Sequence, residues 1–81
     1  MNELNLEEIA DVVGEFADLS GVRIAESTRL GDDIPIDSRQ MLRVAARLES
    51  RYGVRFTSED LITTRTLGDL LNVTRRRAGM A

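Results

Sequence analysis

Helical periodicity, with a capping residue at the start of each periodic stretch, is the feature that most limits how this 81-residue chain can fold. In the first stretch Asn5 stands three residues before Glu8, which is the spacing of a capping box. The apolar residues that follow recur at helical spacing on one face: Leu6, Ile9, Val13, Phe16 and Ala17. Gly21 is expected to end this helix, because glycine tolerates the left-handed conformation found at many helix C-termini.

A second helix is predicted to follow Asp37, with Gln40 at the reciprocal position of a capping box and Gly53 at its end. The side chains expected to form its buried stripe are Met41, Val44, Ala45, Leu48 and Tyr52.

The C-terminal part of the chain predicts one short and one longer helix. A single turn should run from Thr57 or Ser58 to Leu61, and the last helix should open at Thr66, with Asp69 three residues later. That helix is expected to bury Leu67, Leu70, Leu71 and Val73 before the run Arg75, Arg76 and Arg77. We expect these three arginines to form a solvated tail that complements the negative end of the helix.

Residues 22–37 lose helical periodicity and contain Gly31 and the only proline, Pro35. A loop of this length inside a compact domain is usually either functional or disordered. Its apolar side chains can hold it against the helices: Val22, Ile24, Leu30, Ile34 and Ile36. We therefore expect an ordered, functional loop.

Three main helices, one short helix and a long first loop can share one core only as a compact bundle. The sequence thus predicts a single all-α domain, a small four-helix bundle whose folded core covers about residues 5–77, with a flexible tail at residues 78–81. The start at Met1 and the short tail favour a discrete protein over a domain cut from a larger multidomain protein.

The chain contains no cysteine and no histidine. This composition excludes disulfides, a thiolate nucleophile, an imidazole base and the usual zinc ligands, and leaves only carboxylate-based metal sites possible. We expect no catalytic residue and assign no metal ligand. Acidic residues near the start argue against a secretory signal, and no apolar segment reaches membrane-spanning length. We therefore expect a soluble, cytoplasmic protein that does not bind membranes.

The charges divide at residue 38. Residues 1–38 hold ten acidic residues and two arginines, a sum of −8, and residues 39–81 hold nine arginines and four acidic residues, a sum of +5; together they give the net charge of −3. Nucleic-acid binding proteins usually present a clearly basic face interleaved with aromatic residues. A small net negative charge does not provide such a face, so we expect no nucleic-acid partner.

Five segments in succession carry a family resemblance: Leu30-Gly31-Asp32-Asp33, Ile36-Asp37-Ser38, Leu48-Glu49, Tyr52-Gly53-Val54-Arg55-Phe56 and Thr66-Leu67-Gly68-Asp69-Leu70. With these segments the chain resembles, over nearly its whole length, the acyl carrier proteins of fatty-acid, polyketide or related pathways. In that family a serine accepts 4'-phosphopantetheine from coenzyme A, and the terminal thiol of this arm carries acyl groups as thioesters.

The resemblance implies that Ser38 carries the arm. A phosphodiester at a helix N-terminus would be favoured by about 0.3 to 1 kcal/mol, because unpaired N–H groups and the positive end of the helix dipole lie there. The alternative is that Ser38 only fills the first helical turn. Asp37 either caps the helix or helps position a metal ion during attachment, a role also open to Asp33, although Asp32 and Asp33 are more simply solvated loop residues.

The sequence departs from the family pattern directly after Ser38, where Arg39 replaces the usual leucine. Arginines then recur every four residues and form what we call the arginine row: Arg39, Arg43, Arg47 and Arg51. One interpretation is an ordinary solvated face, partly neutralised by acidic residues of the first helix: Glu7, Asp11, Glu15 and Asp18.

The other interpretation of the arginine row is a docking surface. With Leu42 and Ala46 beside it, the row would select partners whose docking surface is acidic or weakly charged, since like charges exclude the wrong enzymes. Arg39 could also pair with the phosphate of the arm.

The resemblance implies a monomeric, non-catalytic carrier. Its partners would be a phosphopantetheinyl transferase, which attaches the arm with magnesium, and acyl-loading, condensing and modifying enzymes. The departure at Arg39 favours polyketide or other specialised biosynthesis over housekeeping fatty-acid synthesis. An aminoacyl or D-alanyl carrier is the alternative within the class, and an unmodified helical interaction module is the alternative outside it.

Overall fold

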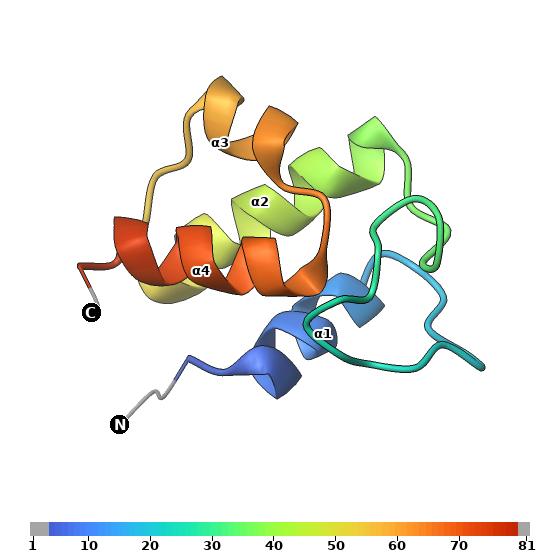
Figure 1. Ribbon diagram of the computed structural model, residues 1–81. Helices are drawn as coiled ribbons and strands as arrows, with labels where there is room; N and C mark the ends of the chain where they lie inside the picture. Colours follow the sequence, from blue (N-terminus) through green and yellow to red (C-terminus); the bar gives the residue numbers. More distant parts are fainter. Residues whose placement is uncertain (1–3, 80–81) are drawn as a thin grey trace.

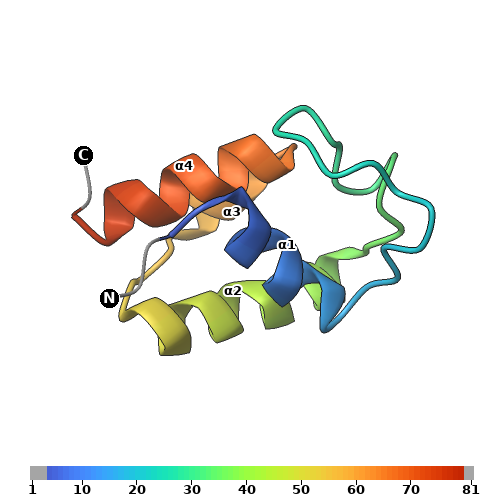
Figure 2. The same ribbon diagram turned by 90° about the horizontal axis from the view of Figure 1, so that it is seen from below.

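The computed structural model describes residues 4–79 and contains four helices: α1 (Leu6–Gly14), α2 (Ser38–Tyr52), α3 (Ser58–Thr63) and α4 (Leu67–Arg77). Helix α1 packs against both α2 and α4, and the short α3 lies on the far side of the bundle (Figures 1 and 2). The predicted all-α four-helix bundle with a long first loop is confirmed. The expectations that rest on Met1 and on residues 80 and 81 concern positions outside the described part of the chain.

The core is formed where the apolar stripes of α1, α2 and α4 meet. Its largest fully buried apolar side chains are Ile9, Ile34, Leu48, Leu67 and Leu70. Leu4 is also buried, so the core begins one residue earlier than predicted. Among the residues that the structure describes, no helix has the length and apolar character required to span a membrane.

The predicted boundaries of α2 and the start of α4 are confirmed. Asp37 and Gln40 form the capping box of α2, and Gly53 ends it with a left-handed φ of 67°. Thr66 and Asp69 form the capping box of α4. In the middle of the chain, α3 begins after its cap as expected and runs two residues beyond Leu61, the predicted end.

The predicted end of the first helix at Gly21 is wrong, because α1 stops at Gly14. The amides of Phe16 and Ala17 both donate to the Val13 carbonyl, at 3.0 Å each, and this tight turn closes the helix. Leu19 then folds back over Gly14, where an added Cβ would lie 3.3 Å from Leu19 Cδ1. Gly21 does adopt a left-handed φ of 73°, but in the following turn.

The start of α1 is capped from one side only. Asn5 Oδ1 accepts the Glu8 amide at 3.0 Å, as predicted. The Glu8 carboxylate does not reach back to the cap; it accepts the Tyr52 hydroxyl at 2.5 Å and so joins α1 to the end of α2. Burial and this carboxylate raise the pKa of Tyr52 to about 12.

The long first loop is ordered, as expected, and it is held by α4. The amides of Leu67 and Gly68, at the start of α4, donate to the carbonyls of Thr28 and Glu26, each at 2.9 Å. These bonds supply acceptors to N–H groups that a helix start leaves without partners. Of the apolar loop residues, Ile34 is buried, whereas Ile24 is 38% exposed and does not help to hold the loop, contrary to the prediction.

The run of arginines Arg75–Arg77 forms the last turn of α4 and is not the solvated tail that the sequence predicts. The helix continues through Arg77. Arg75 donates to the Leu4 carbonyl, with its Nη2 at 3.0 Å, and Arg77 forms a two-point pair with Asp60, both N–O distances being 2.8 Å. These contacts join the end of α4 to the N-terminal segment and to α3, and the pKa of Asp60 is held far below its usual range mainly by the Arg77 guanidinium.

Candidate functional site

Ser38 is the first residue of α2, and it is exposed. The backbone around it is fixed by the capping box: Asp37 Oδ1 accepts the Gln40 amide, and Gln40 Oε1 accepts the Asp37 amide, each at 2.8 Å. The side chains of Asp37 and Gln40 are therefore both hydrogen-bonded to backbone amides on either side of Ser38. Its hydroxyl is left accessible at a rigid helix start.

A second contact of Gln40 fixes α2 relative to α1. Its Nε2 donates to the Phe16 carbonyl at 2.7 Å, across 24 positions of sequence. This bond uses a carbonyl that the short α1 leaves beyond its last turn. The site is thus braced by the end of α1 as well as by its own cap.

The loop segment before Ser38 is held by its own turn. Asp33 Oδ2 accepts the Arg29 amide at 2.8 Å, and the Gly31 amide donates to the Ile34 carbonyl at 2.8 Å. Gly31 needs its φ of 95° to make this turn, which a residue with a Cβ rarely adopts. Asp32 forms only an exposed pair with Arg29, at 3.3 Å.

The acidic residues near Ser38 have structural partners. Asp37 caps α2 and Asp33 closes the loop turn, so each carboxylate already accepts a backbone amide. Within residues 4–79, no three histidine, cysteine or acidic side chains are grouped as a metal site would require.

The start of α2 can hold an anion on Ser38. The amides of Gln40 and Met41 are used by Asp37, but no hydrogen bond among the described residues uses the amides of Ser38 or Arg39. Free amides at a helix N-terminus and the positive end of its dipole favour a negative group there. The exposed hydroxyl and these amides fit a phosphodiester linkage at Ser38.

The arginine row divides into two halves. Arg47 Nε pairs with Glu15 at 3.0 Å, and the Arg51 guanidinium carbon lies 5.9 Å from the centre of the Tyr52 ring. Arg39 and Arg43, nearer to Ser38, are exposed and form no ion pair with any described residue.

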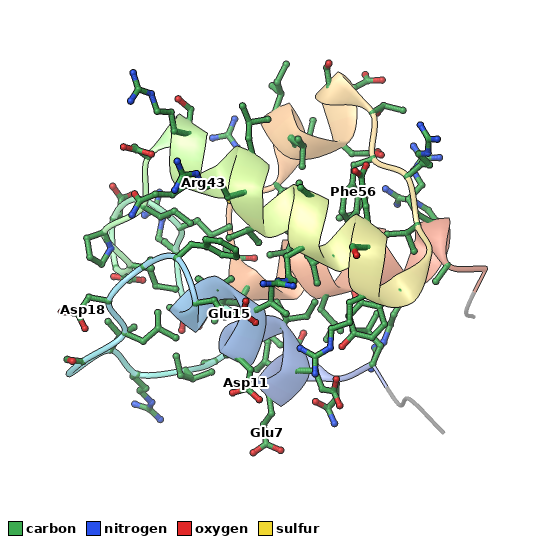
Figure 3. All side chains as sticks on the ribbon, turned by 180° about the vertical axis from the view of Figure 1, so that it is seen from behind. Glu7, Asp11, Glu15, Asp18, Arg43 and Phe56 are labelled. Atoms are coloured by element: carbon green, nitrogen blue, oxygen red, sulfur yellow. The ribbon has the colours of Figure 1, made fainter. Side chains whose placement is uncertain are left out.

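One interpretation of the row was that acidic residues of the first helix partly neutralise it, and among them Glu15 alone forms an ion pair with a described arginine of the row. Glu7 and Asp11 extend from α1 away from α2, and Asp18 lies beyond the end of α1 (Figure 3). Asp18 accepts the Ser20 amide at 2.9 Å. Hydrogen bonding to the Ser20 side chain, and then to this amide, lowers the pKa of Asp18.

Apolar surface accompanies the unpaired arginines. Leu42 is 60% exposed. A shallow hollow of about 300 Å³ lies between α2 and the end of α1, lined by Phe16, Arg43, Ala46, Arg47 and Ser50. Leu42 and Ala46 were predicted beside a docking face, whereas Phe16 was assigned only to the core and Ser50 to no site.

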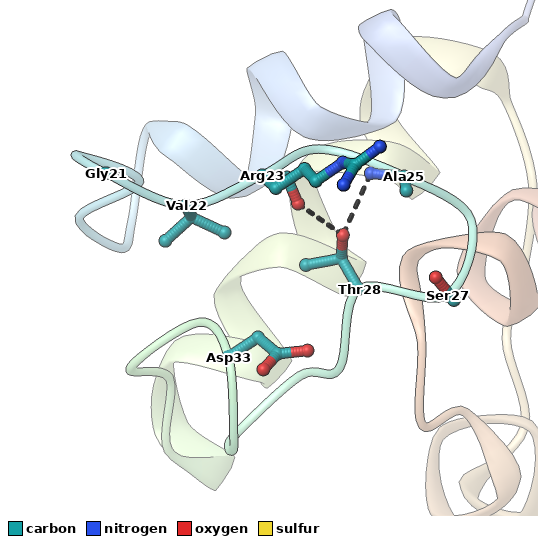
Figure 4. A pocket seen from close by; sticks show the side chains of 7 residues that line it. All are labelled: Gly21, Val22, Arg23, Ala25, Ser27, Thr28 and Asp33. Carbon is teal, nitrogen blue, oxygen red and sulfur yellow. Dashed lines mark hydrogen bonds between the residues drawn. The ribbon is translucent and has the colours of Figure 1, made fainter.

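A larger hollow, of about 530 Å³, lies inside the first loop and is lined by Gly21, Val22, Arg23, Ala25, Ser27, Thr28 and Asp33 (Figure 4). Thr28 is buried there and has its hydrogen bonds satisfied, accepting the Ala25 amide and donating to the Arg23 carbonyl. Ser38 does not line this hollow. We read it as part of the loop architecture.

Comparisons with known proteins show which proteins this chain resembles. A family model described as a phosphopantetheine attachment site matches residues 7–73. The meromycolate extension acyl carrier protein of Mycobacterium tuberculosis is 35% identical over 63 residues, which cover 78% of this chain and 55% of that protein. The acyl carrier protein of Rhodococcus erythropolis is 33% identical over 64 residues, 79% of this chain and 70% of that protein. The chain thus spans little more than half the length of the mycobacterial relative.

A solved structure has the same fold. The acetyl actinorhodin acyl carrier protein from Streptomyces coelicolor superposes with a TM-score of 0.76 over 94% of this chain and 92% of that one. At 24% identity this likeness establishes the fold alone.

Proposed function

The chain belongs to the acyl carrier protein family, whose cofactor is a covalently attached 4'-phosphopantetheine, and on this premise we propose that Ser38 bears the arm. The observation that carries the proposal is the exposed Ser38 hydroxyl at a capped helix start with two free amides. The other side chains at this helix start, Asp37 and Gln40, are occupied by the capping box.

In the attachment reaction this chain is the substrate. A separate transferase, with magnesium, would promote attack of Ser38 Oγ on the pyrophosphate of coenzyme A. A new Oγ–P bond forms, the P–O bond of the pyrophosphate breaks, 3',5'-ADP leaves, and the hydroxyl proton passes to a base of the transferase. The amides of Ser38 and Arg39 would stabilise the resulting phosphodiester.

The same proposal makes the chain a non-catalytic carrier. The attached arm supplies the thiol on which acyl groups are held as thioesters, and this chain holds the arm at an exposed, rigid position. Asp37, Gln40 and the Phe16 carbonyl hold that position by hydrogen bonds. We place the carrier in the cytoplasm and treat it as a monomer, which fractionation of cells and sedimentation of the holo protein test.

For the pathway, we propose specialised acyl-chain biosynthesis, such as polyketide synthesis, rather than housekeeping fatty-acid synthesis. The departure at Arg39 and the two unpaired arginines support a dedicated set of partner enzymes. The match to carrier proteins named for meromycolate extension also supports a dedicated acyl-building role. An aminoacyl or D-alanyl carrier would use the same arm and is the alternative.

Two mass measurements test this function. Incubation of the purified chain with coenzyme A, magnesium and a broad-specificity phosphopantetheinyl transferase should add the mass of one phosphopantetheine, whereas an unmodified interaction module would gain none. Holo protein isolated from its natural host and treated with hydroxylamine should then release an acyl hydroxamate. Release of an aminoacyl hydroxamate would instead identify the alternative carrier class.

A further inference from the structure

We propose that the first two turns of α2 form a docking face for an enzyme whose surface carries carboxylates around an apolar side chain. The docking face consists of Arg39, Leu42, Arg43 and Ala46. The inference rests on the proposed function, because an enzyme that acts on Ser38 or on the arm must approach this end of α2. It adds the chemistry that the approaching surface must have.

Geometry places the docking face on the outer side of α2. At 100° per residue, its four side chains fall within a sector of about 100° that is opposite the fully buried Leu48. All four are exposed, and Leu42 keeps 60% of its surface open. Ser38 adjoins this sector at the start of the helix.

The charges on the docking face indicate that the partner's surface is acidic. Arg39 and Arg43 are four residues apart, repel each other and oppose the positive end of the helix dipole. The chain compensates Arg47 with Glu15 but brings no described acidic side chain to Arg39 or Arg43. Glu7 and Asp11, which could have neutralised them, point away from α2 (Figure 3). A partner with carboxylates at this position would supply the missing counter-charges, and a basic surface would be repelled.

The apolar surface of the docking face indicates that the partner also presents an apolar side chain. The hollow of about 300 Å³ beside Arg43 has Phe16 and Ala46 in its lining and arginines at its edge. Leu42, four residues before Ala46 on the same helix, adds exposed apolar surface beside it. This combination fits an apolar side chain flanked by carboxylates, which an acidic protein surface provides and a nucleic-acid backbone does not.

A peptide titration of the holo chain tests the docking face. The probes are an acidic peptide in which leucines alternate with pairs of glutamates, the same peptide with serines in place of the leucines, and the same peptide with lysines in place of the glutamates. On adding the acidic leucine peptide, the largest NMR shifts should fall on amides 39–46. The serine peptide should bind more weakly, and the lysine peptide should leave these amides unshifted.

Charge reversal at matched positions isolates the two arginines. Arg39→Glu together with Arg43→Glu should weaken the acidic leucine peptide by at least about tenfold, because attractive pairs become repulsive. Arg55→Glu, an exposed change beyond the other end of α2, should change the dissociation constant by less than about twofold. Glutamate near a helix N-terminus is favourable, so the double variant should stay folded.

Three results would overturn the docking face: shifts centred on residues 75–77, an equal effect of Arg55→Glu, or binding of the lysine peptide at residues 39–46. Intact mass separates this failure from failure of the carrier function. A chain that takes up the arm but binds the acidic peptide elsewhere remains a carrier without this docking face.

Discussion

Gln40 donates from Nε2 to the Phe16 carbonyl at 2.7 Å and thereby ties the start of α2 to the end of α1. The same side chain accepts the Asp37 amide through Oε1 at 2.8 Å. One amide side chain therefore serves both the helix cap beside Ser38 and the packing of two helices. The proposed attachment site is therefore held both by its own helix cap and by the end of α1, through the single side chain of Gln40.

Gln40→Ala should lower the free energy of unfolding by about 1 to 2 kcal/mol, since it removes both the reciprocal cap bond and the bond to Phe16. Gln40→Glu should also destabilise the fold, because its carboxylate can still accept the Asp37 amide but would face the Phe16 carbonyl with an acceptor in place of the donor. Urea denaturation measures both changes. Ser50→Ala, on the exposed side of the same helix, is the control and should stay within about 0.5 kcal/mol of wild type. If Gln40→Ala and Ser50→Ala have the same free energy of unfolding, the hydrogen bonds of Gln40 do not stabilise the fold.

Gly68→Ala should loosen the first loop. A Cβ at residue 68 would lie 2.9 Å from the Glu26 carbonyl oxygen and Cβ, so the loop must shift away from α4 and lose the Gly68 amide bond. Overpacking of this kind costs about 1 to 3 kcal/mol. Gly14→Ala is the matched control, because its Cβ meets only the end of the Leu19 side chain at 3.3 Å. The Leu30 amide donates to the Arg65 carbonyl, just before α4, at 2.8 Å. Its hydrogen exchange should accelerate in the first variant alone; unchanged exchange would contradict the coupling of loop and α4.

Asp60→Asn should separate α3 from the end of α4 and lower the free energy of unfolding at neutral pH by about 2 kcal/mol, through loss of a charge-assisted pair. The folded pKa of Asp60 lies below its unfolded value of 3.8. The pair therefore contributes fully above that unfolded pKa, and its contribution declines as pH falls below it. The difference between wild type and Asp60→Asn should be constant near neutral pH and shrink in acid.

Denaturation curves across acidic and neutral pH measure this difference. The control is Asp32→Asn, which breaks an exposed pair with Arg29 and should matter little at any pH. A stability difference for Asp60→Asn that grows as the pH falls would show that the pair does not stabilise the fold in this way.

Local signals in the sequence were enough to predict α2. Its cap, its length and its glycine stop are set within the helix itself, so Asp37, Gln40 and Gly53 behave as expected. The starts of α3 and α4 follow from the same chemistry at Thr57 and Thr66. The position of Ser38 at a helix start was therefore predictable from its neighbours.

Contacts between distant residues explain what the sequence did not reveal. Helix α1 ends early because Leu19 folds back onto Gly14, although the periodicity continues to Phe16 and Ala17. Arg77 looked like a solvated tail because its partner, Asp60, is 17 positions away and would itself be read only as a capping residue.

At the candidate site, too, contacts between distant residues were not predictable from the sequence. The arginine row is visible in the sequence, but its division depends on Glu15 reaching Arg47 and leaving Arg43 unpaired. The exposure of Ile62, which is 75% open, was also missed, because α3 is too short for its periodicity to be read.

Intact-mass spectrometry of Ser38→Ala tests the central claim most directly. Wild type should gain one phosphopantetheine when incubated with coenzyme A, magnesium and the broad-specificity transferase. Ser50→Ala should gain one as well, because it retains Ser38 at the start of α2. Ser38→Ala should gain none while keeping the helical circular dichroism of wild type. Modification of Ser38→Ala, or its absence from wild type under conditions that modify a known carrier, would contradict the assignment of Ser38.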